Sequence, residues 1–178
     1  ETLPVINHSR ERMDSIELYP FKELIKSNVG GVMVAHLYLP AYDKTPRRAS
    51  TLSPLIVKEL LKTQLGFKGL VFTDALNMKG VSKYYKPGEA DLSALLAGND
   101  VLLFPENVPK AVSEIKKALD NGQLSQAELD EKVRKILLAK YQAGLFNYSP
   151  IELRGLVEDL NDNKGESLRE MLYMRAAT

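Results

Sequence analysis

Three short apolar runs alternate with helical patterns along this chain, and the alternation limits the folds open to it. The runs are Val32–Leu39, Gly69–Asp74 and Val101–Phe104. Each is short enough for a strand, and glycine, aspartate or proline residues mark its ends. The run starts lie about 30 to 40 residues apart, which suits a strand, a crossover helix and the next strand. We therefore expect an α/β fold with parallel strands and right-handed crossovers.

The segment after the first run is typical of a helix start. Ser53 offers a hydroxyl cap, and Pro54 follows in the first turn. A stripe with helical spacing comes next, formed by Ile56, Leu60 and Leu61. This spacing predicts that one face of the helix is buried.

Four further helices are expected from capping signals and apolar periodicity. They span Asp14–Ser27, Glu89–Ala97, Pro109–Leu119 and the segment from the capping box Ser125–Glu128 to Tyr141. Within the first of them, Pro20 predicts either a kink or a later helix start.

The order of elements indicates part of a larger (β/α) protein, cut on its N-terminal side. The first element is a helix with no strand before it, and three strands cannot close a barrel of eight. From residue 148 the chain is charged and has no strand pattern, with helices expected over Glu152–Leu160 and Glu166–Arg175 and a loop over Asn161–Gly165. We interpret residues 148–178 as a helical linker toward a further domain.

Asp74 is the first candidate for chemistry because it ends a run that is expected to be buried on both faces. Ligands gather at the carboxyl ends of parallel strands, so a carboxylate placed there is neutralised, paired or used. A helix cap or turn residue is the structural alternative. Asp100, in contrast, opens its run and is expected at the opposite edge, where a structural role is typical.

The segment around Asp74 resembles a known family. Leu65–Met78 is similar to the nucleophile segment of glycoside hydrolase family 3, in its bacterial β-N-acetylglucosaminidase (β-N-acetylhexosaminidase) branch. Val34-Ala35-His36 and Ala97–Leu102 resemble strands of the same family. The β-glucosidase branch usually has tryptophan after the nucleophile, whereas this chain has Ala75 and no tryptophan. The resemblance covers roughly Leu3 to Leu145.

The resemblance implies that residues 1–147 are the C-terminal portion of an incomplete (β/α)8 TIM-type barrel, about the last three β/α units. It implies that Asp74 is the nucleophile of a retaining glycosidase that removes terminal β-linked N-acetylglucosamine, with peptidoglycan as one source. His36 and Met78 are expected to contact the sugar. No metal or organic cofactor is implied.

The resemblance also implies that this chain alone is inactive. The acid/base of this branch is an Asp-His pair on a mobile loop upstream, and the sequence has no Asp-x-His. An incomplete barrel exposes strand edges and apolar faces, so we expect the chain to need its missing half or to self-associate.

The composition of the chain limits the classes of binding partner that we expect. With 24 basic and 23 acidic residues the net charge is +1, which gives no bulk attraction to nucleic acid or anionic lipid. No apolar run is long enough for a membrane span. The absence of cysteine excludes disulfides and thiol catalysis, and leaves the bacterial cytoplasm and the periplasm both open.

Two other classes of function stay open. A response-regulator receiver also carries an aspartate at a strand end, but here Gly80 follows too early and the acidic pair for Mg²⁺ is missing. The other is a non-catalytic scaffold that binds sugar or a protein partner without performing chemistry.

Overall fold

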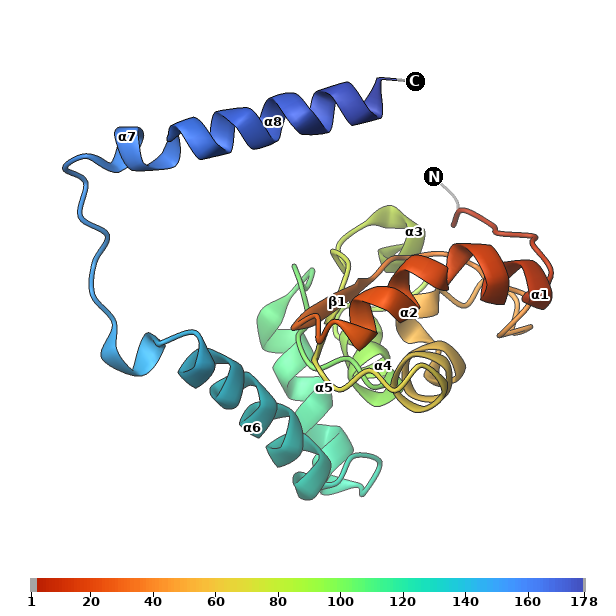
Figure 1. Cartoon of the computed structure of the whole chain (residues 1–178). Helices are drawn as coiled ribbons and strands as arrows, with labels where there is room; N and C mark the ends of the chain where they lie inside the picture. Colours follow the sequence, from red (N-terminus) through yellow and green to blue (C-terminus); the bar gives the residue numbers. More distant parts are fainter. Residues whose placement is uncertain (1–2, 178) are drawn as a thin grey trace. The chain divides into compact units, whose positions relative to one another are not determined.

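The computed structural model describes residues 3–177, and Figure 1 shows its elements in chain order. Contacts divide the chain into two compact units, one ending at Ala143 and one beginning at Gly144. The first unit holds both strands, and the second contains helices and connecting segments. The boundary between units falls a few residues before the predicted linker. The interpretation of residues 148–178 as a linker stays a prediction.

The sheet of the first unit consists of two short parallel strands, β1 (Gly31–Val34) and β2 (Leu70–Thr73). Gly31 pairs with Leu70, and Val34 pairs with Thr73. Both strands therefore end at the same edge of the sheet. This parallel pairing is the one that the spacing of the first two runs predicts.

The first run leaves the sheet earlier than predicted, because side chains take over its hydrogen bonds. The strand expected over Val32–Leu39 ends at Val34. Beyond it, the hydroxyl of Ser50 donates to the carbonyl of Ala35 at 2.5 Å and accepts from the backbone N–H of Leu37 at 3.1 Å. These bonds replace the backbone partner that a longer strand would need.

The third run, Val101–Phe104, was wrongly predicted to be a strand. It contributes a single parallel bridge to Phe72. Its Leu103 N–H then donates to the hydroxyl of Thr73 at 2.8 Å, so a side chain interrupts the backbone ladder. Phe104 has φ 44, in the left-handed region that a strand cannot contain.

Nine helices occur among the described residues of the first unit. They are α1 (Arg10–Arg12), η1 (Met13–Glu17), α2 (Tyr19–Lys26), η2 (Ser50–Leu52), η3 (Leu55–Gln64), α3 (Lys79–Ser82), α4 (Glu89–Ala97), α5 (Val108–Asp120) and α6 (Gln126–Gln142). The prediction for α4 is confirmed at both ends, and α5 and α6 match within a residue or two. The segment expected to be helical over Asp14–Ser27 is interrupted at Leu18, and the later helix start predicted from Pro20 is confirmed, since Pro20 lies in the first turn of α2.

Ser53 does not cap the helix that follows it, so that part of the prediction is wrong. Its hydroxyl donates to Oδ2 of Asp43 at 2.5 Å, in the loop after β1. Burial raises the pKa of Asp43, but hydrogen bonds from Ser53 and Thr45 outweigh it and hold the pKa below its usual value. The predicted apolar stripe on η3 is confirmed, since all three of its members are buried: Ile56, Leu60 and Leu61.

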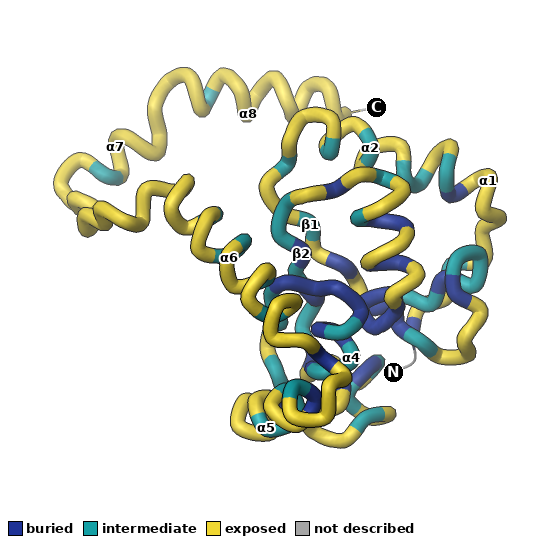
Figure 2. Tube along the Cα trace, turned by 90° about the horizontal axis from the view of Figure 1, so that it is seen from below, coloured by how far each residue is buried: buried dark blue, intermediate teal, exposed yellow. Residues whose placement is uncertain are grey.

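The core lies between the sheet and the helices η3 and α4. One buried cluster joins the two strands to both helices and contains Val34, Val57, Leu61, Phe67, Val71 and Ala97. Figure 2 shows buried residues in dark blue, whereas α6 has exposed and intermediate residues and none that is buried. Each buried aliphatic side chain contributes roughly 1.5 to 3 kcal/mol, so this cluster is a main source of the stability of the unit.

The second unit contains η4 (Leu145–Asn147), α7 (Leu156–Leu160) and α8 (Asn163–Ala176), with no buried residue in its helices. The helix expected from Glu152 starts later because Gly155 has φ 78. The loop expected over Asn161–Gly165 is mostly helical, since Asp162 caps α8 by accepting from Gly165 N at 2.7 Å. Within residues 3–177, no helix has the length and apolar character needed to span a bilayer.

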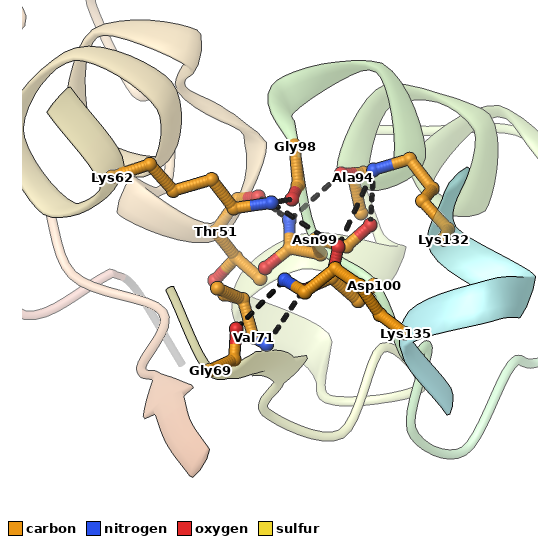
Figure 3. A network of polar contacts seen from close by, with 10 residues as sticks. All are labelled: Thr51, Lys62, Gly69, Val71, Ala94, Gly98, Asn99, Asp100, Lys132 and Lys135. Carbon is orange, nitrogen blue, oxygen red and sulfur yellow. Dashed lines mark hydrogen bonds and ion pairs between the residues drawn. The ribbon is translucent and has the colours of Figure 1, made fainter. Parts of the chain in front are cut away.

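Asp100 joins α6 to the amino-terminal edge of the sheet, and Figure 3 shows its surroundings. Its Oδ2 accepts from Val71 N at 2.9 Å and from Lys135 Nζ at 2.7 Å. Its Oδ1 accepts from Lys62 Nζ at 3.1 Å, and Lys132 Nζ lies 3.8 Å away. The predicted structural role of Asp100 is confirmed by these contacts.

Candidate active site

Asp74 lies directly after β2, at the carboxyl edge of the sheet. Its backbone N–H donates to the carbonyl of Val34 at 3.0 Å, which ties it to the end of β1. Its Oδ1 accepts from the N–H of Ala75 at 2.8 Å. The residue is half-buried, so the carboxylate is anchored at its base and still reaches the surface.

The loop after Asp74 is fixed by the third apolar run. Leu76 N donates to the carbonyl of Leu103 at 2.9 Å, and Asn77 N donates to that of Phe104 at 3.1 Å. The Leu76 side chain is only 1% exposed. Although this run is not a strand, it therefore holds the loop that carries Asp74.

His36 lies beneath this loop and is 5% exposed. Its Nδ1 is 2.6 Å from the hydroxyl of Thr51, and its Nε2 is 3.0 Å from the carbonyl of Ala75. The structure therefore places His36 beside the Asp74 loop, as the strand-end position predicts. Contact between His36 and a sugar stays a prediction, and both ring nitrogens already have protein partners.

Met78 is the third predicted site residue and belongs to the same loop as Asp74. Its N–H donates to the carbonyl of Ala75 at 3.1 Å, which closes a turn. Its side chain is 46% exposed. The structure thus brings His36, Asp74 and Met78 together at one edge, and the sugar contact of Met78 stays a prediction.

Thr51 and Ser50 support this edge, and the sequence interpretation did not assign them a role there. Both follow the loop after β1 and are at most 2% exposed. Thr51 contacts the ring of His36, while Ser50 binds the backbone that leads to it. The only signal in the sequence is a pair of hydroxyl residues before Ser53-Pro54, which also suits an ordinary helix start.

A hollow of about 310 Å³ is formed by residues that follow β1 and β2 and by the N-terminal segment. It is lined by Leu3, Val5, Tyr38, Pro46, Arg47 and Tyr84. The guanidinium of Arg47 lies 6.0 Å from the centre of the Tyr84 ring. Arg47 therefore has an aromatic partner, and its backbone has φ 60, in the left-handed region.

Among residues 3–177 no group of three or more histidine, cysteine, aspartate or glutamate side chains is placed to hold a metal ion. What the edge offers is one carboxylate in a frame of backbone hydrogen bonds. Such a carboxylate can act as a nucleophile or as a base.

Comparison with known proteins identifies the protein family of this chain. The profile of the glycosyl hydrolase family 3 N terminal domain matches residues 1–139. The chain therefore belongs to glycosyl hydrolase family 3.

Relatives within the family agree with this assignment. The chain is 30% identical to "Beta-hexosaminidase A" of Pseudoalteromonas piscicida over 157 residues, covering 78% of this chain and 26% of that protein. It is 30% identical to "Periplasmic beta-glucosidase" of Salmonella typhimurium, covering 91% of this chain and 20% of that protein. It is similar in structure to a family 3 beta-N-acetylglucosaminidase from Paenibacillus sp. str. FPU-7, with a TM-score of 0.81 and 34% identity over 86% of this chain and 30% of that one.

The chain thus spans between a fifth and about a third of the length of the relatives named here. The family assignment favours glycosidase chemistry over the receiver alternative.

Proposed function

We propose that this chain supplies the nucleophile of a retaining glycoside hydrolase that removes terminal β-linked N-acetylglucosamine. One observation carries the proposal: in a family 3 chain, Asp74 follows β2 and is tied at its backbone to the end of β1. A nucleophile that is held by a strand end in this way keeps its orientation toward the anomeric carbon.

The proposed reaction has two steps. A carboxylate oxygen of Asp74 attacks the anomeric carbon while an acid protonates the leaving oxygen, and a covalent glycosyl-enzyme forms. Water, activated by the same acid/base, then releases the sugar with its configuration retained. The acid/base lies about 5 Å from the nucleophile in such enzymes, and the sequence has no Asp-x-His to provide it. We therefore propose that the isolated chain does not turn over substrate.

We further propose that residues 1–147 form about the last three β/α units of a (β/α)8 barrel. The parallel register of β1 and β2 supports this, as does the bridge from β2 to the third run. An apolar hollow of about 330 Å³ lies beside β1, with exposed Phe21 and Met33 in its lining. We expect preceding barrel elements, or a second copy of the chain, to cover this surface.

The substrate class is proposed from the names of the relatives and from Ala75. Several relatives are named as hexosaminidases, and Ala75 stands where the resemblance gives tryptophan to the β-glucosidase branch. The Salmonella relative, named as a β-glucosidase, keeps β-glucosides as the second candidate. Relative rates on aryl N-acetylglucosaminide and aryl glucoside would decide between them, and a faster glucoside would overturn our choice.

Covalent trapping tests the nucleophile. A protein that joins this chain to the barrel elements preceding it in its relatives would be incubated with a slow fluorinated N-acetylglucosamine donor. We expect mass spectrometry to locate the sugar on the peptide that contains Asp74. Asp74→Asn should abolish the adduct and lower turnover by about 10⁴-fold or more, as for other catalytic groups.

Asp91→Asn provides the matched control. Asp91 lies on α4, is 2% exposed and carries the same side chain as Asp74, and burial raises the pKa of its carboxyl. An adduct on another carboxylate, or turnover that survives Asp74→Asn, would show that Asp74 is not the nucleophile. Protein that is inert to donor and substrate alike would favour the non-catalytic scaffold.

A further inference from the structure

We propose that His36 is a positioning residue for Asp74, and that Thr51 holds the His36 ring in the orientation this requires. The inference rests on the proposed function of Asp74 and assigns to His36 a role other than sugar contact. A continuous set of buried hydrogen bonds carries it, and this set runs from α4 through η2 and the end of β1 to the loop after β2.

The hydrogen-bond partners define the orientation of the ring. The carbonyl of Ala75 only accepts, so the Nε2 that lies 3.0 Å from it carries the proton. The hydroxyl of Thr51 can then donate to Nδ1, which lies 2.6 Å away. The same hydroxyl lies 2.9 Å from the carbonyl of Ala35, which also accepts from Ser50, and 3.5 Å from the carbonyl of Val34. Both ring nitrogens therefore have a protein partner.

Thr51 is itself fixed from the other side. Its backbone carbonyl accepts from Nδ2 of Asn99 at 2.8 Å, and the same amide donates to the carbonyl of Ala94 at 2.7 Å. Thr51 and Asn99 are both 0% exposed. The residue that orients the imidazole is thus held by hydrogen bonds between η2 and the end of α4, two elements far apart in the sequence.

The ring acts on Asp74 through the backbone of Ala75. The N–H of Ala75 donates to Oδ1 of Asp74 at 2.8 Å, and the carbonyl of Ala75 is held by His36 and by Met78 N. The N–H of Asp74 also donates to the carbonyl of Val34. Asp74 is therefore held on both sides, by Val34 at its own N–H and by Ala75 at its carboxylate. Without the His36 bond, the Ala75 carbonyl keeps only the N–H of Met78, and the turn that presents the Ala75 N–H to the carboxylate is held less firmly.

An apolar side chain in place of His36 would fill the same volume and leave this bond unmade. A role in packing and a role in positioning therefore predict different results. Small errors in the placement of a nucleophile cost up to about 100-fold in rate, because attack needs aligned atoms at near-contact distance.

The first test measures amide hydrogen exchange in the 178-residue chain. His36→Leu keeps apolar bulk and removes both ring bonds, whereas His36→Gln keeps an N–H donor toward Ala75. We expect the Ala75 amide to exchange at least about tenfold faster in His36→Leu and to stay within about threefold of the parent in His36→Gln. The Val71 amide, at the other end of β2, is the internal control and should not change.

Thr51→Val is the second variant, because it removes only the hydroxyl that orients the ring. It should speed exchange at Ala75 less than His36→Leu does. If His36→Leu speeds Ala75 and Val71 equally while Thr51→Val leaves Ala75 unchanged, His36 is a packing residue and the inference is wrong.

The second test uses the longer protein of the trapping experiment. His36→Leu should slow formation of the Asp74 adduct by about 100-fold with little change in KM, and His36→Gln should recover most of that loss. If Asp74→Asn abolishes the adduct but His36→Leu forms it at the parent rate, only the present inference fails. If Asp74→Asn leaves turnover intact, the proposed function fails, while the exchange result at Ala75 still reports on the hydrogen bond.

Discussion

Asp74 and Asp100 occupy opposite edges of the same small sheet, and their surroundings differ in kind. Asp74 follows β2 and is half-buried, and its carboxylate accepts from the N–H of Ala75, whose carbonyl contacts the imidazole of His36. Asp100 precedes the third run, has a side chain that is 1% exposed, and faces three ammonium groups. Both are fixed in place, but only one keeps a carboxylate that a substrate could reach.

The comparison teaches what separates a structural carboxylate from a reactive one. Burial raises the pKa of Asp100, yet hydrogen bonds from Lys135 and Val71 and the nearby lysine charges outweigh it and lower the pKa. The charge of Asp100 is balanced by lysines whose ammonium groups also donate to backbone carbonyls, as Figure 3 shows. The carboxylate of Asp74 accepts instead from a neutral backbone N–H, which orients it without cancelling its charge.

The largest expected effect in this comparison is on stability. Asp100→Asn should lower the free energy of unfolding by about 3 kcal/mol, because three ammonium groups lose their shared counter-charge. The lysine side chains are 12–26% exposed and can rehydrate in part, which keeps the loss at the lower end of the usual range. Denaturant unfolding measures it.

Glu114→Gln, which breaks the exposed pair with Lys117 on α5, is the control and should cost less than about 0.5 kcal/mol. The Ala75 amide should keep its exchange rate relative to global unfolding in both variants. An Asp100→Asn loss below about 1 kcal/mol would show that the lysine cluster does not anchor α6.

A smaller effect concerns pH. Burial, together with the neighbouring charge of Lys62, lowers the pKa of Lys132 from 10.5 to about 8. The folded state therefore binds less proton than the unfolded state between these values, and stability should rise with pH through that window. The cost of the charged amine is fully present below about pH 8.

Lys132→Met should flatten this rise, since the variant has no amine to titrate at that position. Lys62 shifts in the same direction, so a residual slope is expected. The measurement is denaturant unfolding at several pH values from 7 to 10. Parent and variant curves that run parallel would contradict the lowered pKa of Lys132.

The smallest effect is expected at the start of α6. Ser125 and Glu128 form a reciprocal capping box, with Ser125 Oγ accepting from Glu128 N at 3.2 Å. Ser125→Ala should cost about 1 kcal/mol. Exchange should increase first at the α6 amides, while Ala75 at the site edge stays protected. Ser125→Thr keeps a hydroxyl cap and should restore most of the loss; equal losses in both variants would place the effect outside the cap.

The sequence predicted the local parts of the molecule well. The bounds of α4, the capping box of α6 and the buried stripe of η3 all depend on residues three or four positions apart, whose geometry a helix fixes. The position of Asp74 at the end of a buried strand was read in the same way. Failures occurred where a distant partner intervened: Ser53 bonds Asp43 instead of its own helix, and Phe104 turns out of the sheet.

The sequence by itself determined that a carboxylate follows a buried strand in a family 3 chain, because strand and helix periodicity and the Asp74 segment are written in consecutive residues. Only the tertiary structure decided what surrounds that carboxylate. His36 reaches Thr51 across 15 positions and Ala75 across 39, and Asp100 reaches Lys135 across 35. Contacts of this kind depend on how successive β/α units pack against one another. The residues that meet are separated by a whole crossover connection, so no periodic pattern in the sequence links them.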